Sequence, residues 1–414
     1  MRHQKLAGAA DSCVGTSSIT PLPAPSEPSP LSGTSNMKAI NYHVDDKNLT
    51  TNTAVEKYRC KAVAAAAEGA KMSDAYTLAL NHIIYYDLKN HTINELGLSS
   101  HQDEIKASLG VDADLPMLDS RLSVVAFEVI QMMTRGSVDD VEILLAEKLI
   151  AAKKAKDKRM TCLVKLLTNY FNKVGQSLDT TEDTFVSQTI GPFLELYFDS
   201  MNATEHHASR GRLEQPGSFS SSSASTKRSY SSSSKSDLST SWYTLQPDYL
   251  LKGLFENGLK IDVFLAEFKK PSAKPSQILN DKVKLGNLMK LMVDRLVFLG
   301  VPSPVVCGLF ADGRMTYTYK MTIKKDGEYE FVELGCFGTI RCTSDLMSLP
   351  IMMAYFEQLA EIVKQTLEKM EIKLSGEVIP GPLALLPVPV EYLRCSYEYP
   401  SCVSLSSGSK KTNL

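Results

Sequence analysis

The sequence predicts an α+β protein in which a helical N-terminal region precedes a core of mixed strands and helices. Between about Val55 and Gly175, apolar residues recur mostly at three- and four-residue steps, which is typical of amphipathic helices. After residue 246, short apolar runs separated by Asn-Gly and Asp-Gly turn signals alternate with long helical stripes. The chain has 414 residues, of which 43% are hydrophobic, so it can bury a sizeable core.

Shifts in composition divide the chain into four zones. Residues 1–52 are rich in Ser, Thr, Pro and Asn and are expected to be disordered. Residues 53–178 form the helical region, and residues 179–375 form the α/β core. A Ser-rich stretch within 205–241 cannot supply burial, and we expect it to be a flexible insertion. Residues 376–414 form a tail that carries Pro and Ser.

Composition also limits the classes of function. No uninterrupted apolar run is long enough to span a membrane, and the start lacks the apolar segment of a secretory signal. The eight cysteines are scattered without a CxxC pair, which argues for reduced thiols and against a structural zinc. We therefore expect a nuclear or cytoplasmic protein that does not enter a membrane. The formal net charge is −2, so binding of nucleic acid would have to depend on a local patch.

The first helix of the core is predicted over 181–201. Thr180 with Asp183 makes a [ST]-x-x-[DE] start, and the apolar residues that follow fall on one stripe. The best candidate for a strand before the next motif is Ser241 to Leu245. His206 and His207, beside the low-complexity stretch, are interpreted as loop residues and not as ligands.

Residues 247 to 270, PDYLLKGLFENGLKIDVFLAEFKK, predict a buried β-hairpin. Asn257-Gly258 is the strongest signal for a two-residue type I′ turn. That turn places Glu256 opposite Leu259 and, if no bulge intervenes, Asp248 opposite Glu267 at the far end. Gly253 is a position where a bulge would change this register.

The charged ends of this hairpin are the candidate site. Side chains alternate between the two faces of a strand, so Glu267 and Lys269 share a face with Asp248. Two carboxylates opposite each other repel unless a cation neutralises them, and Mg²⁺ or Mn²⁺ favours such oxygen ligands. We predict that Asp248 and Glu267 hold the metal and that Lys269 orients water at a phosphate.

The remaining elements follow from similar signals. A second helix starts near Pro275, which suits a first turn, and ends before Gly300. Three strands are predicted at 305–310, 316–323 and 329–334, with Asp-Gly turns between them, and a final helix at 344–373.

Pro247-Asp248 followed by Glu267-Phe268-Lys269 resembles the core motif of the PD-(D/E)xK nuclease superfamily, and the resemblance covers roughly 180 to 375. The amino-acid sequence of this region is also similar to nuclease-like proteins of early-diverging fungi. The resemblance implies an αβββαβ core and Mg²⁺- or Mn²⁺-dependent hydrolysis of nucleic acid, either DNA or RNA. It also implies that Glu195, on the first helix, is a further acidic residue at the metal.

A second interpretation stays open. The three charged residues can be a structural cluster at a strand end, and Glu195 can be a solvated helix residue. The protein would then be a catalytically inactive nuclease-fold protein that binds a partner protein through its helical region. The lysines along the second helix suit contact with phosphates but also ordinary solubility.

Overall fold

The computed structural model describes residues 51–174, 181–199, 201, 204–208, 213, 246–273, 275–324, 326–376 and 388–394. All of them belong to one compact unit. This unit is mixed α and β, as predicted, and its centre is a seven-stranded mixed sheet. The segment 1–52, for which disorder was predicted, lies outside the described residues except at its end, where α1 begins at Thr51.

The sheet has the strand order β1-β7-β6-β5-β4-β3-β2. The pairs β4–β5 and β1–β7 are parallel, and the other neighbours are antiparallel. The strands are β1 (Ile83–Tyr86), β2 (Thr204–Ala208), β3 (Tyr249–Leu254), β4 (Lys260–Phe268), β5 (Val305–Ala311), β6 (Met315–Ile323) and β7 (Tyr329–Gly338). The three strands predicted after residue 300 are therefore confirmed.

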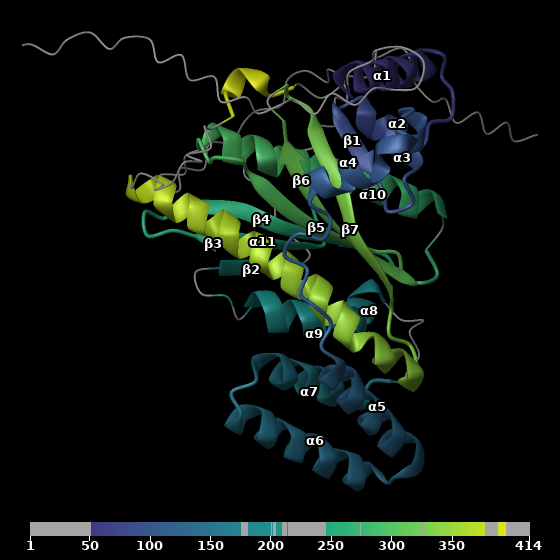
Figure 1. Cartoon of the computed structure of the whole chain (residues 1–414), viewed down its shortest axis with the longest axis vertical. Coiled ribbons are helices and arrows are strands. Elements are labelled where there is room, and N and C mark those ends of the chain that lie inside the picture. Colours follow the sequence, from purple (N-terminus) through teal and green to yellow (C-terminus); the bar gives the residue numbers. More distant parts are fainter. Residues whose placement is uncertain are drawn as a thin grey trace, which may run out of the picture. The chain divides into compact units, whose positions relative to one another are not determined.

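Two long helices cover the opposite faces of this sheet (Figure 1). They are α10 (Pro275–Phe298) and α11 (Leu349–Ser375), and a 3₁₀ turn, η4 (Thr343–Ser348), precedes α11. On the α10 face, Gly308 of β5 leaves room for Met289, whose Sδ would lie 2.6 Å from an added Cβ. On the other face, Thr366 of α11 donates a hydrogen bond of 2.9 Å to the carbonyl of Val305.

The helix predicted near Pro275 is α10, and its two ends have the expected causes. Proline fixes φ near the helical value and lacks the N–H that a first turn leaves unpaired. At the other end, Gly300 adopts φ of +72°, a left-handed conformation that suits glycine after a helix. Between them, buried residues such as Leu285, Leu288 and Met292 pack on the sheet.

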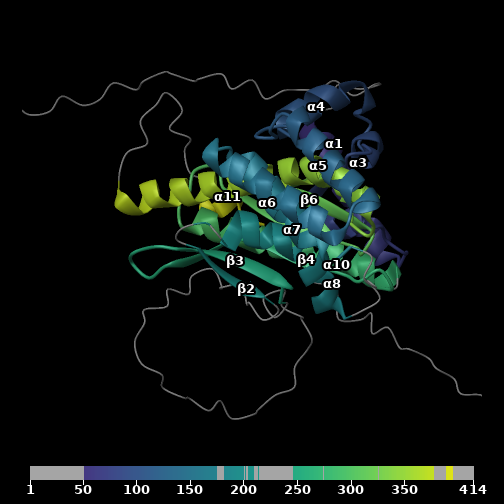
Figure 2. The same ribbon diagram turned by 90° about the horizontal axis from the view of Figure 1, so that it is seen from below.

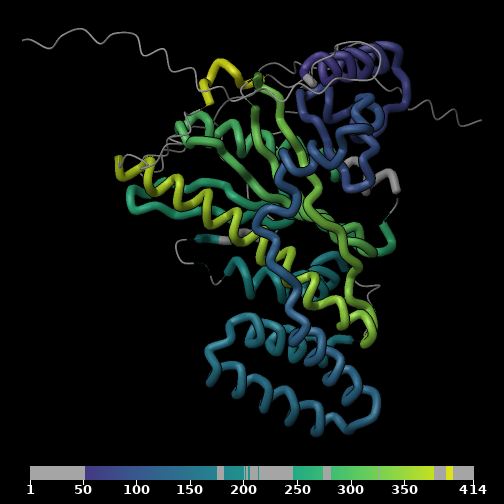
Figure 3. The backbone as a smooth tube through the Cα atoms, viewed as in Figure 1, coloured from purple at the N-terminus to yellow at the C-terminus, as the bar shows by residue number. Residues whose placement is uncertain are grey.

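The N-terminal region contains a strand, which the prediction of a purely helical region missed. Ile83–Tyr86 forms β1, and all four residues are buried. β1 pairs with β7 in parallel, and Figure 3 shows how the backbone of this N-terminal region runs. The helices around it are α1 (Thr51–Ala67), α2 (Asp74–Ala79), α3 (His91–Glu95), the 3₁₀ turn η1 (Ser99–His101) and α4 (Gln102–Leu109). The first part of the predicted helical region is therefore largely helical but also adds one strand to the sheet.

The second part of that region is helical, as predicted. The helices α5 (Ser120–Arg135), α6 (Val138–Lys154) and α7 (Lys158–Phe171) contact one another (Figure 2). Asp119, Ser137 and Asp157 cap their N-termini with side-chain oxygens, which satisfies N–H groups of each first turn. The outer sides of α5 and α6 expose several large apolar side chains: Val124, Phe127, Val138, Ile143 and Ile150.

The first helix of the core is broken into pieces. It consists of α8 (Glu182–Thr189), α9 (Gly191–Leu194) and a π-helical turn, η2 (Glu195–Asp199). Its N-cap is Thr181, whose hydroxyl accepts from the N–H of Thr184, whereas Thr180 lies outside the described residues. The following strand is β2, so His206 and His207 belong to a strand and not to a loop. Ser241 to Leu245, the predicted strand, lies outside the described residues, as does the Ser-rich stretch 218–241.

The tail and α11 complete the fold. Residues 388–394 pack on the core: Val388 is buried, and the carbonyl of Arg394 accepts a hydrogen bond of 2.5 Å from Lys290. A short 3₁₀ turn, η5 (Val390–Tyr392), lies in this segment. The helical stretch Thr343–Ser375 is long and apolar enough to span a membrane, but 61% of its most apolar window is buried inside the protein. That burial suits the core helix that it forms here.

The hairpin between β6 and β7 carries a carboxyl group that should make stability depend on pH. Burial, and then the neighbouring Asp326, raise the pKa of Glu328 from 4.5 to about 7. The folded protein therefore holds this proton more tightly than the unfolded chain, so stability falls as pH rises from 4.5 through 7. Melting temperatures between pH 5 and 8 should fall less steeply for Glu328→Gln than for the wild type. Equal slopes would contradict this assignment.

A candidate site of carboxylates and lysines

The hairpin that carries the site has a different turn from the predicted one. The N–H of Phe255 donates to the carbonyl of Leu259 at 3.1 Å, which leaves three residues in the loop, and Gly258 has φ of +77°. Leu254 is therefore opposite Lys260 and not opposite Ile261. A three-residue loop of this kind needs only one left-handed residue, and glycine supplies it.

A bulge farther along the hairpin restores the predicted register. The pairing shifts by one residue between Leu251 and Lys252, and from Leu251 opposite Phe264 onward it is the predicted one. The shift at the turn and the shift at the bulge cancel, so the predicted alignment holds at the end of the strands. The extra residue is Val263 of β4, because Leu251 pairs with Phe264 whereas the next residue, Lys252, pairs with Asp262. Beyond the bulge, Asp262 lies on the α10 side of the sheet, where Arg295 is 3.8 Å away.

Asp248 lies just before β3 and joins the two strand ends. Its Oδ2 accepts a hydrogen bond of 2.8 Å from the backbone N–H of Phe268, at the end of β4. The side chain is partly exposed. Asp248 therefore keeps one carboxylate edge fixed against β4 while part of the group faces solvent.

Glu267, on β4, is completely buried, with 0% of its surface exposed. The ammonium group of Lys284, from α10, lies 2.7 Å from its Oε1 and 2.8 Å from its Oε2. The same ammonium donates to the carbonyl of Gln246 at 2.7 Å. Burial, and then the charge of Asp248, hold the pKa of Glu267 well above its usual value, while Lys284 acts in the opposite direction.

Lys269 lies on the same side of the sheet as Glu267, because both contact α10. Its Nζ lies 3.3 Å from Asp281 of α10 and 3.6 Å from Glu182 of α8, and it donates to the carbonyl of Phe268 at 2.9 Å. Burial alone would lower the pKa of Lys269, but the nearby carboxylates raise it overall. The structure thus brings Lys269 into the same charge cluster as Asp248 and Glu267.

Glu195 does not join this cluster. It is exposed on η2, and within the described part of the chain its carboxylate makes no hydrogen bond or ion pair. The acidic residue that the first helical segment contributes is Glu182, at the first position of α8. The predicted role of Glu195 at a metal therefore has no support from its position.

Three residues of the cluster were missed from the sequence: Glu182, Asp281 and Lys284. Asp281 and Lys284 are three residues apart on α10, so they lie on the same side of that helix. The sequence shows this spacing, but it does not show that α8 and α10 approach the ends of the strands. The contacts of Glu182, Asp281 and Lys284 depend on how these helices pack.

Negative charge is in excess at this site. Four carboxylates, those of Glu182, Asp248, Glu267 and Asp281, surround two ammonium groups, those of Lys269 and Lys284. Burial is the main cause that raises the pKa values of Glu182 and Asp281, and Asp248 raises both further. A site with this surplus would favour an additional cation.

The oxygens present fit a magnesium ion in part. Among the described residues, no three His, Cys, Asp or Glu side chains are grouped so that they could hold a metal by themselves. Mg²⁺ is usually bound through one or two carboxylates and completes its shell with water and substrate phosphate. Asp248 and Glu267, with the nearby Gln246 carbonyl, can supply that smaller set only if the Lys284 ammonium gives way.

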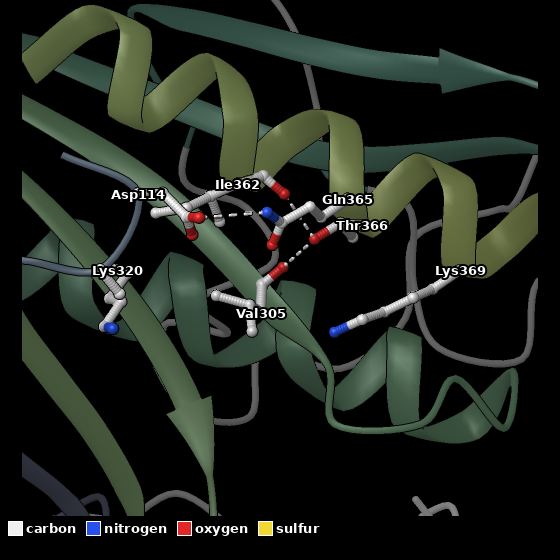
Figure 4. A pocket seen from close by; sticks show the side chains of 8 residues that line it. Asp114, Val305, Lys320, Ile362, Gln365, Thr366 and Lys369 are labelled. Carbon is white, nitrogen blue, oxygen red and sulfur yellow. Dashed lines mark hydrogen bonds between the residues drawn. The ribbon is translucent and has the colours of Figure 1, made fainter. Parts of the chain in front are cut away.

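A separate pocket lies between α11 and the sheet (Figure 4). Its volume is about 80 Å³, and it is lined by Ala113, Asp114, Val305, Lys320, Ile362, Gln365, Thr366 and Lys369. Gln365 lies near Asp114, with 3.4 Å between Nε2 and Oδ1. No residue of the charge cluster lines this pocket, so the two features are distinct.

We compared the chain with known proteins. No protein-family model matches it, and neither a curated protein nor a solved structure matches it.

Proposed function

We propose that the protein is a metal-dependent phosphodiesterase that acts on nucleic acid. The observation that carries the proposal is the cluster at the ends of β3 and β4, where Asp248, Glu267 and Lys269 lie together. The chain order also supports it. A helical segment, three antiparallel strands, a helix and then β5 parallel to β4 follow one another, in the αβββαβ order of PD-(D/E)xK nucleases.

The roles of the residues follow from their positions. Asp248 and Glu267 would hold Mg²⁺ or Mn²⁺, which would supply positive charge beside a scissile phosphate. Asp281 and Glu182 hold the Lys269 side chain in place. Lys269 would orient the attacking water and stabilise the negative charge that develops on the phosphate. The backbone N–H of Phe268 fixes the orientation of the Asp248 carboxylate.

A test combines metal binding with cleavage. In the wild type, Mn²⁺ should raise the melting temperature, and this shift should disappear in Asp248→Asn, which keeps an acceptor for the Phe268 N–H. Lys269→Met should lower the rate of cleavage of single- or double-stranded DNA or RNA by about 10²-fold or more. Glu195→Gln, an exposed residue of the same charge type, is the control and should behave as the wild type.

Two results would contradict the proposal. One is wild-type cleavage, with Mg²⁺ or Mn²⁺, that does not exceed that of Lys269→Met. The other is a Mn²⁺ shift that persists in Asp248→Asn, because the ion would then bind elsewhere. Circular dichroism of each variant shows whether a loss of cleavage comes from a loss of fold.

One observation favours a second candidate, a nuclease-fold protein without catalysis. Nζ of Lys284 lies 2.7 Å from Oε1 and 2.8 Å from Oε2 of Glu267, and Glu267 has no exposed surface. The exposed apolar side chains of α5 and α6 are of the kind found at protein interfaces. This candidate predicts no Mn²⁺ shift in the wild type, so the same titration distinguishes it from the enzyme.

A further inference from the structure

We infer that Lys284 is a built-in counter-cation that occupies the position of the metal, so that a divalent ion binds only when this ammonium withdraws. The inference rests on the proposed function, because it concerns the same site. It concerns what controls entry of the metal and not the chemistry that follows.

The contacts of the ammonium group resemble an oxygen shell. Nζ of Lys284 lies 2.7 and 2.8 Å from the two oxygens of Glu267 and 2.7 Å from the carbonyl oxygen of Gln246. These three oxygens come from the ends of β4 and from the segment just before β3. An ion bound by Glu267 would need the same carboxylate oxygens, so the ion and the ammonium exclude each other.

Glu267 is completely buried, whereas the Lys284 side chain that contacts both of its carboxylate oxygens is 18% exposed. Withdrawal of Lys284 toward solvent would therefore uncover these two oxygens. Without either cation, the carboxylate would be buried with no positive partner at contact distance among the residues that the structure describes, which is costly in the protein interior.

Asp281 offers Lys284 a second ion-pair partner when Lys284 leaves Glu267. Asp281 lies three residues earlier on α10, a spacing that brings side chains together on one side of a helix. The charge of Lys284 already acts on Asp281, although Asp281 contacts Lys269 in this structure. If the Lys284 ammonium moved from Glu267 to Asp281, it would still be paired with a carboxylate. Glu267 would then be open to a metal ion, which would neutralise its charge.

Lys282 provides a matched control on the same helix. Its Nζ lies 3.5 Å from the hydroxyl of Tyr85 and 5.2 Å from the ring centroids of Tyr85 and Tyr317. It makes no ion pair with the cluster acids among the described residues. Removing its charge should therefore change the net charge by the same amount without opening Glu267.

The experiment measures Mn²⁺ binding by isothermal titration calorimetry, without substrate, in four proteins: wild type, Lys284→Gln, Lys282→Gln and Asp248→Asn. Glutamine keeps a hydrogen-bond donor for Glu267 but removes the charge. Lys284→Gln should bind Mn²⁺ roughly tenfold tighter or more, because no ammonium competes for the carboxylate. Lys282→Gln should bind as the wild type does. Folding of Lys284→Gln only when Mn²⁺ is added would support the inference equally.

The contrary outcomes separate the two proposals. If the wild type binds Mn²⁺ and Asp248→Asn does not, but Lys284→Gln binds no tighter, the inference is wrong and the proposed function stands. A Lys284→Gln protein that stays unfolded at saturating Mn²⁺ also overturns the inference. If no protein binds the ion, the proposed function fails and this inference fails with it.

Discussion

Lys284→Met should lower the free energy of unfolding by about 3–5 kcal/mol in metal-free buffer, the usual cost of leaving a buried charge without its partner. Methionine keeps most of the side-chain volume, so the loss reports on the charge and not on a cavity. Urea unfolding at neutral pH, with a chelator present, measures the change. The double variant Glu267→Gln with Lys284→Met should recover much of the lost free energy of unfolding, because the buried carboxylate without a partner is then absent.

The control for this variant is Lys364→Met on α11. The Lys364 side chain is 60% exposed and lies 3.9 Å from Glu361 and 3.7 Å from Glu368. Exposed pairs of this kind contribute about 0–1 kcal/mol. Equal costs for Lys284→Met and Lys364→Met would show that Lys284 does not neutralise a buried carboxylate.

The cost of Lys284→Met should also depend on pH. The pKa of Glu267 is already raised by burial in the wild type, and without Lys284 it should rise further. A raised folded pKa means that stability is highest when the group is protonated and is lost as pH rises. The variant should therefore recover toward wild-type stability as pH falls toward 4.5, the value for an unperturbed glutamate.

Gly313→Ala should destabilise the protein by about 2–5 kcal/mol, the sum of a left-handed backbone conformation and a steric clash. Gly313 has φ of +85° in the turn between β5 and β6. A Cβ there would lie 2.4 Å from the nitrogen and 2.5 Å from the Cα of Pro271. These are backbone atoms of the loop that follows Lys269, so this loop must move. Cleavage should fall together with stability.

Gly258→Ala provides the comparison, because Gly258 has φ of +77° but nothing within 4 Å of an added Cβ. Its cost should be only the conformational one, about 1–2 kcal/mol. Denaturant unfolding measures the loss of unfolding free energy in both variants, and the difference between the two losses is the cost of the clash at Gly313. If Gly313→Ala costs no more than Gly258→Ala, the loop after Lys269 is not held by this contact.

The sequence predicted the elements whose signals are local. Pro275 and Gly300 mark the two ends of α10, and glycines with positive φ lie in each of the three predicted hairpins. β1 was missed because a four-residue apolar run cannot be told from part of a buried helix by its period. The strand β2, where a loop was predicted at His206 and His207, was missed because polar residues, TEHHA, form it. Its pairing with β3, and not its own composition, makes it a strand.

The candidate site was predictable as far as one hairpin determines it. Asp248, Glu267 and Lys269 lie within a 22-residue stretch whose register at the far end was correct, although it depended on a bulge that cancels the error at the turn. Glu182 and Lys284 come from helices separated from the strands by turns or long connections. Tertiary packing decides that Glu182 approaches Lys269 and that Lys284 approaches Glu267, and no local pattern in the sequence reports these contacts.

The parallel pairing of β1 with β7 has a consequence for any attempt to divide the protein. A shortened chain that begins at α5 would lack Ile83–Tyr86 and would leave without partners those backbone N–H and C=O groups of Tyr329 to Val332 that face β1 and not β6. An unprotected strand of this kind is a template for pairing between molecules. β1 thus covers this edge of the sheet, and a chain that begins at α5 should not be expected to stay monodisperse without it.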